Sequence, residues 1–435
     1  MTLPPGPKLP GLAQTVGMLS RPHGFLERCR RRYGDVFTVN IAPYGRMVFL
    51  ADPALIRQVF TGPTHLFHVG GVRGRVLSPL LGEHSLLLLD EDEHMRERKL
   101  MLPAFHGEAL RRYPELIEEI AEEQVRGWPV GEPMSLRPRM QAITLEVILR
   151  LVIGVRDPDA LGRLRDLLGR LLDQPTTLLF LATAANRDLS WFPPWRRFLE
   201  IRARADELIH MEIARRRADP SGEDILSLLV QASGQSLTDA ELRDELMTLL
   251  IAGHETTATA LAWAFERLTR HPAVLARLRE GDPSFLDAVI KETLRVRPVV
   301  MEVGRDITEH AQIGEWDLPA GTRVMSSIAL VQKAEQHWPD PLAFRPERFL
   351  DTQPAPYTWI PFGGGPRRCI GASFATTEMA SIIPVVLRHF DLVPDRPEPE
   401  RSQTRNVTQV PARGARVVLS ARASEREPHG VLSAV

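Results

Sequence analysis

The sequence is poor in cysteine and in net charge. Its 435 residues include 2 cysteines, Cys29 and Cys369, which lie far apart in the chain. This spacing provides no disulfide framework and favours a reducing compartment. The formal net charge of −1 gives no global attraction to nucleic acid or to a membrane. We therefore expect no disulfide scaffold and no nucleic-acid partner.

The sequence also lacks a long apolar run. A helix that crosses a bilayer needs about 20 consecutive apolar residues, and the longest apolar stretches here are shorter. The N-terminus, MTLPPGPKLPG, has no apolar segment like that of a signal peptide. We expect a soluble, cytoplasmic protein without a membrane anchor.

No Ser/Gly-rich linker or abrupt change of charge divides the chain, so residues 1–435 are predicted to form a single domain. Hydrophobic residues make up 43% of the chain and charged residues 25%, as in an ordinary globular protein with a large core. We interpret residues 1–20 as a proline-rich arm and residues 420–435 as a loose C-terminal tail.

Apolar periodicity predicts a mainly helical fold with a small β-rich part. Tyr113 to Arg217 is typical of helices broken at prolines, whereas His65 to Leu81 contains several glycines and is predicted to be irregular. Strands are expected at residues 36–41 and 47–50, which would form a hairpin, and at residues 299–303, 323–327, 390–393 and 416–419.

One segment, FGGGPRRCIG from Phe362 to Gly371, contains Cys369. Three consecutive glycines and a proline predict a loop, and the helical spacing that follows, as far as Pro384, puts Cys369 at or just before a helix N-terminus. Free backbone N–H groups, the helix dipole and two neighbouring arginines should lower the pKa of this thiol.

A thiolate in such a loop has several possible uses. A zinc site needs several Cys or His at short spacing, and a redox pair needs a second cysteine nearby, so both are disfavoured here. A nucleophile, a haem ligand and a buried structural cysteine remain open. The pattern FxxGxRxCxG, formed by Phe362, Gly365, Arg367, Cys369 and Gly371, resembles the haem-binding loop of the cytochrome P-450 family. The resemblance implies haem b as the cofactor, with Cys369 as the axial iron ligand.

A second motif lies in a long predicted helix. Thr238 and Glu241 form a capping box, and apolar periodicity continues from Leu242 to Leu268. The middle of this helix reads Ala252-Gly253-His254-Glu255-Thr256-Thr257, where a glycine, a carboxylate and two hydroxyls weaken the helix and suggest a local opening of its hydrogen bonds.

A hydroxyl beside a carboxylate suits proton delivery. The pattern AGxETT resembles the oxygen-activation segment of cytochromes P-450. The resemblance implies that Thr256 hydrogen-bonds the oxygen bound at the iron, that Glu255 supplies protons from solvent, and that Ala252 leaves room for O2. The alternative is a kinked buried helix with an incidental ion pair.

Basic residues are candidates for binding the haem propionates. His94 and Arg98 are four residues apart on one face of a predicted helix, which could also be a solvated charged helix. The resemblance implies that both bind a propionate, together with Arg305 and Arg367. Arginine pairs well with carboxylates, although a surface position is the alternative for Arg305 and Arg367.

A third group of residues is predicted to have a structural role. Glu292 and Arg295 are three residues apart on one helix face, and Arg348 follows in the segment PERF. An exposed pair of this kind is worth little, but in the resembled family the three residues form a buried charge network behind the haem.

The resemblance covers essentially the whole chain and implies a monooxygenase that inserts one atom of O2 into an apolar molecule such as a terpene, steroid, fatty acid or polyketide. A separate ferredoxin is expected to donate electrons on the Cys369 side, where Arg368, with Arg96, Lys99 and Arg112 as further candidates, could form a positive patch for it. The protein is expected to be a monomer. The alternative is a peroxygenase or a non-oxidative haem-thiolate enzyme of the same fold.

The substrate pocket is expected to involve Gly70 to Leu81, Pro175 to Ala185, the Met247 to Thr256 face and Val299 to Val303. Within VVMEVGRD, Glu302 is a conspicuous carboxylate. It could contact a polar group of the substrate, or strand alternation could point it away from the pocket.

Overall fold

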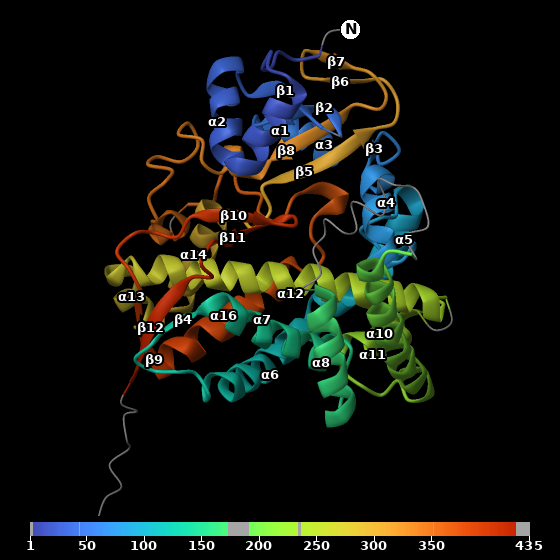
Figure 1. Cartoon of the computed structure of the whole chain (residues 1–435), viewed down its shortest axis with the longest axis vertical. Helices are drawn as coiled ribbons and strands as arrows, with labels where there is room; N and C mark the ends of the chain where they lie inside the picture. The colour runs from blue at the N-terminus through green and yellow to red at the C-terminus, as the bar shows by residue number, and fades with distance from the viewer. Residues whose placement is uncertain (1–2, 43, 173–190, 234–235, 351, 423–435) are drawn as a thin grey trace, which may run out of the picture.

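The computed structural model describes residues 3–42, 44–172, 191–233, 236–350 and 352–422. A β-rich part, with β1, β2, β5 and β8, lies above a larger helical part that the long helix α12 crosses (Figure 1). The mainly helical fold class predicted from the sequence is confirmed. Within the described ranges, no helix is long and apolar enough to cross a membrane.

The helices occupy about half of the described residues. They are α1 (Gly11–Ser20), α2 (Pro22–Tyr33), α3 (Pro53–Thr61), α4 (Gly70–Leu81), α5 (Glu91–Met101), α6 (Glu108–Val125), α7 (Leu136–Val147), α8 (Pro158–Leu172), α10 (Pro193–Ala218), α11 (Ile225–Ser233), α12 (Asp239–Thr269), α13 (Pro272–Leu278), α14 (Pro283–Val296), α15 (Ile328–Val331) and α16 (Ala372–His389). A π-helical turn, Ile148–Val152, extends α7, and 3-10 turns lie at Leu102–Phe105, Pro346–Phe349 and Gly365–Arg367.

The strands form four small sheets. They are β1 (Val36–Ile41), β2 (Gly45–Leu50), β3 (Phe67–His68), β4 (Pro133–Ser135), β5 (Glu302–Ile307), β6 (Ala311–Ile313), β7 (Trp316–Leu318), β8 (Arg323–Ser327), β9 (Phe390–Pro394), β10 (Ser402–Arg405), β11 (Thr408–Pro411) and β12 (Arg416–Ala421). The largest sheet has the order β1-β2-β8-β5-β3, in which only β2 and β8 pair in parallel.

Local sequence explains the elements that position the site. β1 and β2 form the predicted hairpin, in which Phe37 lies opposite Phe49 and their rings stack with centroids 5.6 Å apart. At the start of α12, Thr238 Oγ1 accepts a hydrogen bond from the Glu241 N–H, and the Glu241 carboxylate accepts one from the Thr238 N–H. The capping box therefore begins the helix where the sequence predicted.

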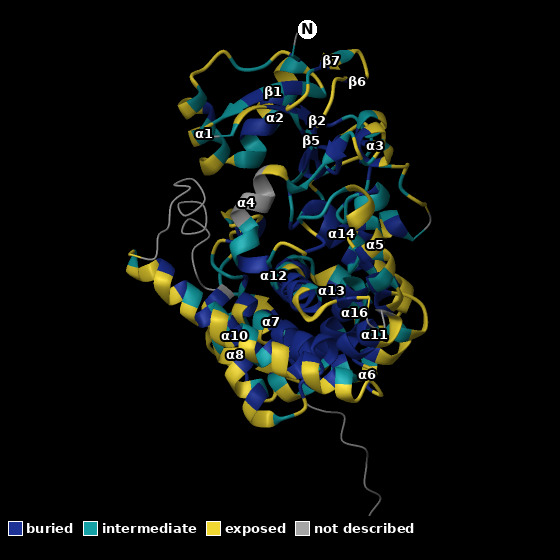
Figure 2. Ribbon diagram, turned by 90° about the vertical axis from the view of Figure 1, so that its right-hand side faces the viewer, coloured by how far each residue is buried: buried dark blue, intermediate teal, exposed yellow. Residues whose placement is uncertain are grey.

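The main apolar core surrounds α12. Buried side chains from α6, α7 and α16 pack with those of α12 in one cluster, and Trp263 of α12 is fully buried. Dark-blue buried segments accordingly concentrate around α12, α7 and α16 in Figure 2. The fold thus holds α16, the helix that follows Cys369, against the helix that contains Thr256.

Several sequence-based boundaries were wrong. Residues 70–81, predicted to be irregular, form helix α4, and the helix after Cys369 continues through Pro384 to His389. Both helices contain an internal proline, Pro79 in α4 and Pro384 in α16, although proline cannot donate the backbone hydrogen bond of a helix interior. The proline-rich arm contains helix α1, and the strand expected at residues 299–303 begins instead at Glu302. Residues 420 and 421, expected in a loose tail, belong to β12, and the rest of that expected tail from residue 423 lies outside the described ranges.

Candidate active site

The loop that carries Cys369 has a backbone only glycine can easily adopt. Gly363 and Gly365 have φ angles of 69° and 65°, in the left-handed region. A Cβ atom on Gly365 would lie 1.8 Å from the carbonyl oxygen of Phe60, at the end of α3. The N–H of Cys369 donates a hydrogen bond to the Phe362 carbonyl at 2.9 Å, which closes the loop. The glycine-rich motif therefore allows close packing of the loop against α3.

The thiol of Cys369 is free and accessible to solvent, three residues before α16 begins. The protein nevertheless surrounds it closely, and this burial raises its pKa. A hydrogen bond from the Gly371 N–H and the charges of Arg98 and Arg368 act in the opposite direction. The sequence-based expectation of a lowered pKa was therefore wrong for the chain alone, because burial outweighs the positive neighbours.

Basic side chains gather beside this loop. His94 of α5 is buried, and burial followed by the charges of Arg367, Arg98 and Arg305 lowers its pKa to about 3. Its Nδ1 atom is buried and has no hydrogen-bond partner among the residues described. Arg98 is close enough to Cys369 for the charge of the thiolate to raise the pKa of the guanidinium, against the larger lowering by burial. The four candidate propionate ligands therefore lie together.

The remaining members of this basic cluster have definite positions. Arg305 is buried on β5, and its guanidinium lies 5.4 Å from the centre of the Phe60 ring. Arg367 donates hydrogen bonds to Asp90 Oδ1 and to the Leu89 carbonyl, both at 2.5 Å. The surface alternative does not hold for Arg305, which is 4% exposed. Asp90 thus pairs with Arg367, and the cluster retains excess positive charge from the other arginines.

Helix α12 has one exposed residue beyond its first turn. Ala252 is exposed, whereas every other residue from Leu242 to Thr269 is buried or half-buried. The helix is continuous there, so the expected opening of its hydrogen bonds is not present. Instead, the Thr256 hydroxyl donates a hydrogen bond to the Ala252 carbonyl at 2.5 Å. Such bonding of a threonine to the preceding turn lets a polar side chain remain within a helix.

Glu255 points from α12 toward α7. Its Oε1 atom accepts a hydrogen bond from Arg137 at 2.5 Å, and its Oε2 atom accepts one from Gln141 at 2.7 Å. The adjacent His254 is buried and is hydrogen-bonded through Nδ1 to Thr144, also on α7. Both carboxylate oxygens of Glu255 are therefore occupied by partners from another helix.

Sequence reasoning missed these partners and one further acid. Arg137 and Gln141 carry no local signal, because the contact between α7 and α12 is purely tertiary. Glu378 of α16 is buried and hydrogen-bonded to Thr257, next to Thr256, and burial raises its pKa well above the usual range. Its place in the apolar pattern of α16, at a core position, was the available signal.

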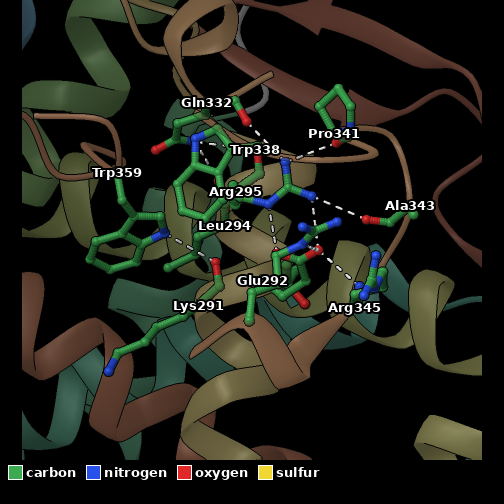
Figure 3. Close-up of polar contacts among 12 residues, drawn as sticks. Lys291, Glu292, Leu294, Arg295, Gln332, Trp338, Pro341, Ala343, Arg345 and Trp359 are labelled. Atoms are coloured by element: carbon green, nitrogen blue, oxygen red, sulfur yellow. Dashed lines mark hydrogen bonds and ion pairs between the residues drawn. The ribbon is translucent and has the colours of Figure 1, made fainter. Parts of the chain in front are cut away.

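The predicted charge network lies in the core. Arg295 donates hydrogen bonds to both carboxylate oxygens of Glu292, at 2.6 and 2.8 Å, and both side chains are fully buried. Arg348 donates to Glu292 Oε1 at 3.2 Å. Figure 3 shows Arg295 also directed at the backbone carbonyls of Gln332, Pro341 and Ala343. This network fixes the segment that precedes the cysteine loop, and loss of one partner would leave a buried charge unpaired.

Glu302 begins strand β5. Its register partner is Ser327, and strand alternation puts it on the same face as Asp306, which pairs with Arg323 of β8. Arg305, near Phe60, belongs to the opposite face. Glu302 Oε1 is buried without a hydrogen-bond partner among the described residues, and burial raises its pKa to about 8. The Glu302 Oε1 atom is therefore not directed to solvent, and a contact with the substrate stays a prediction.

Of the segments expected to line the pocket, one lies outside the described residues and another, predicted to be irregular, is helical. Pro175 to Ala185 lies outside the described residues. Gly70 to Leu81 is helical, and a Cβ atom on Gly71 would lie 2.6 Å from Asp306 Oδ2, so α4 packs against the same face of β5 as Asp306.

Comparison with known proteins defines the class of this chain. A family model described as Cytochrome P450 matches residues 4–417, and the chain belongs to this family. It is 46% identical to cytochrome P450 135B1 of Mycobacterium tuberculosis over 97% of this chain and 92% of the relative. Cytochrome P450 135A1 of the same organism is 41% identical over 96% of this chain and 95% of the relative.

Solved structures agree with this assignment. A retinoic acid-bound cyanobacterial CYP120A1 is 25% identical and superposes with a TM-score of 0.82, covering 97% of this chain and 100% of that one. The haem domain of cytochrome P450DA, at 22% identity and a TM-score of 0.83, shares the fold. The chain is therefore a cytochrome P450 monooxygenase, with haem b as the cofactor that the family implies.

The side chains present fit a haem. Cys369 is a free, accessible thiol, and Arg98, Arg305 and Arg367 form a cationic cluster beside it, together with the neutral His94, whose buried Nδ1 has no partner among the described residues. A dianionic group with two carboxylates would complement this excess of positive charge.

Proposed function

We propose that this protein is an external monooxygenase of lipophilic small molecules, with electrons from a separate ferredoxin. The observation that supports this proposal best is the exposed Ala252 beside the half-buried Thr256, in the middle of a helix that packs against the helix following Cys369. When bound, haem activates O2 so that one oxygen atom enters the substrate and the other leaves as water, which consumes two electrons and two protons.

Each residue of the candidate active site has a proposed role in this reaction. Cys369 ligates the iron, and the basic cluster with Arg305 and Arg367 anchors the propionates. Thr256 places a hydroxyl proton at the exposed turn of α12. Glu255 can carry a proton inward only if it exchanges Arg137 or Gln141 for water, because both partners now occupy its carboxylate.

The proposed substrate is an apolar molecule such as a terpene, steroid, fatty acid or polyketide. The name of the cyanobacterial relative includes retinoic acid, a largely apolar carboxylic acid, which is compatible with this class.

The proposed ferredoxin would approach near Cys369. Arg368 and Lys99 are exposed there, whereas Arg96 pairs with Glu97 and Glu241, and Arg112 pairs with Glu223. The patch therefore depends mainly on Arg368 and Lys99.

The alternative is a peroxygenase of the same fold, which needs no electron donor. Retention of both Glu255 and Thr256 favours the O2-dependent route, since peroxide already carries the electrons and protons. We expect a lipophilic compound that perturbs the haem spectrum to be oxidised in the presence of O2, NADH and a ferredoxin with its reductase. Product formed from hydrogen peroxide at an equal or greater rate, with none from the ferredoxin system, would establish the alternative.

Glu302 provides a separate prediction. If it contacts a polar group of the substrate, Glu302→Gln should raise the substrate dissociation constant about tenfold, as expected when a buried polar group loses its hydrogen-bond partner. The carbon monoxide spectrum should stay unchanged. Substrate titration by the haem spectral shift measures this, and an unaltered dissociation constant would leave Glu302 with a structural role only.

The pH dependence of stability tests the burial of the Glu302 carboxyl independently of its role. The folded-state pKa of Glu302 is about 8, above its ordinary value of 4.5. The stability linked to this carboxyl is fully present below pH 4.5 and is lost as the pH rises through 8. Glu302→Gln should therefore flatten the fall of melting temperature between these pH values, whichever way substrate binding responds.

A further inference from the structure

Helix α1 carries its apolar side chains on the outside. Leu12, Val16 and Leu19 are 73%, 64% and 73% exposed, and Leu9, just before the helix, is 57% exposed. The spacing of four and three residues aligns the three helical side chains in one stripe. Exposed residues along α1 are visible at the edge of the molecule in Figure 2. The stripe has no partner among the residues that the structure describes.

Polar side chains attach the opposite face of α1 to the protein. Gln14 is buried, donates hydrogen bonds to the Pro7 and Leu9 carbonyls at 3.1 and 2.8 Å, and accepts one from the Asn40 N–H at 2.9 Å. Thr15 Oγ1 accepts a hydrogen bond from the Ala42 N–H at 2.9 Å. Met18 packs inward against the cluster of Phe25, but Leu12, Val16 and Leu19 point outward, unlike the usual surface helix, whose apolar face is buried.

The surroundings of the stripe are strongly basic. Lys8 precedes it, Arg21 follows it, and both are exposed. Helix α2, which follows directly, adds exposed Arg28, Arg31 and Arg32. Among residues 3–33 the only acidic side chain is Glu27, which is already paired with Arg31 at 3.0 Å. This local positive charge contrasts with the formal net charge of −1 for the whole chain.

We propose that the stripe of Leu12, Val16 and Leu19, with Leu9, docks on the surface of an anionic lipid bilayer. An interfacial helix buries its apolar face at the headgroup boundary while flanking cations meet anionic headgroups. Lys8 and Arg21, at the two ends of the stripe, are placed for that contact. The protein attaches to one leaflet and does not cross it.

A second copy of the chain is a poorer occupant of this face. Two-fold pairing through α1 would bring the Lys8, Arg21 and α2 arginines of both copies together, and like charges repel. Anionic lipid supplies the missing negative charge at both ends of the stripe. Docking would hold the enzyme where lipophilic molecules dissolve, but it does not depend on which substrate is oxidised.

The test is co-sedimentation of the haem-loaded, full-length protein with vesicles. We expect binding to vesicles of phosphatidylglycerol and phosphatidylcholine in equal parts, little binding to phosphatidylcholine alone, and weaker binding at high salt. Replacing the stripe by Leu12→Gln, Val16→Gln and Leu19→Gln should lower the partition coefficient on the order of tenfold or more. Lys8→Gln with Arg21→Gln should reduce the preference for phosphatidylglycerol.

A matched variant controls for general surface hydrophobicity. Met211, Leu342 and Val407 are 59%, 77% and 70% exposed on other elements, and their replacement by glutamine should leave vesicle binding unchanged. All variants should keep the carbon monoxide spectrum, which reports an intact fold. The proposal is overturned if the wild-type protein stays in the supernatant, or if the matched variant loses as much binding as the stripe variant. It is also overturned if the wild-type protein is a dimer by sedimentation velocity and the stripe variant a monomer.

Discussion

Replacing Cys369 with alanine is expected to abolish the strongly red-shifted absorption band of the reduced, carbon monoxide-bound protein. That band requires a thiolate on the iron, and Cys369 is the free, accessible thiol in the glycine-rich loop. Loss should be complete, because the other cysteine, Cys29, is buried in the core beneath the β1–β2 hairpin. The measurement is the difference spectrum, normalised to haem content.

Two variants make this result interpretable. Cys29→Ala should retain the full band, since its side chain packs with Phe25 and Leu26 in a separate cluster. Cys369→His offers an imidazole in place of the thiolate and should move the band to the position of ordinary haem proteins while haem is retained. If Cys369→Ala and Cys29→Ala both kept the original band, the ligand assignment would be wrong.

Replacing Thr256 with alanine is expected to separate electron consumption from product formation. The variant should bind haem and substrate normally, because among the described residues the Thr256 hydroxyl bonds to the Ala252 carbonyl of its own helix. It should release more hydrogen peroxide, and product formed per NADH oxidised should fall on the order of a hundredfold, the lower end of what a positioned general acid or base contributes. Peroxide and product are measured together in the reconstituted system.

The control for this experiment is another threonine of α12. The Thr269 hydroxyl bonds to the Glu266 carbonyl, so Thr269→Ala removes a similar local hydrogen bond at the far end of the helix. That variant should keep the wild-type yield, and Thr256→Ser should recover most of it. Equal yields from Thr256→Ala and the wild-type protein would remove Thr256 from the mechanism.

The sequence predicted those parts of the molecule whose signals are local. The capping box at Thr238 and the hairpin of β1 and β2 formed where expected, because a few neighbouring residues determine them. The position of Cys369 before a helix followed in the same way from glycine, proline and apolar spacing. The family resemblance then supplied the cytochrome P450 fold and the cofactor, because apolar periodicity predicts only a mainly helical chain.

The features that sequence reasoning missed depend on contacts between distant segments. The pKa of Cys369 was expected to be low from its neighbours in sequence, but burial by the rest of the protein raises it. Glu255 was placed on a path to solvent, whereas Arg137 and Gln141 on α7 hold both of its oxygens. Residues 70–81 were predicted to be irregular because glycine weakens a helix. They form α4 nonetheless, and packing against other segments is what a local sequence pattern does not show.

The contact between Gly365 and the end of α3 constrains the two partners unequally over evolutionary time. The atom that a Cβ on Gly365 would strike is the backbone oxygen of Phe60, which every amino acid possesses. No substitution at residue 60 can therefore make room for a side chain at residue 365, and the two positions have no means of compensating for each other. Residue 60 can drift as its own packing allows, while the loop that presents the thiol keeps its glycine unless the α3 backbone itself moves.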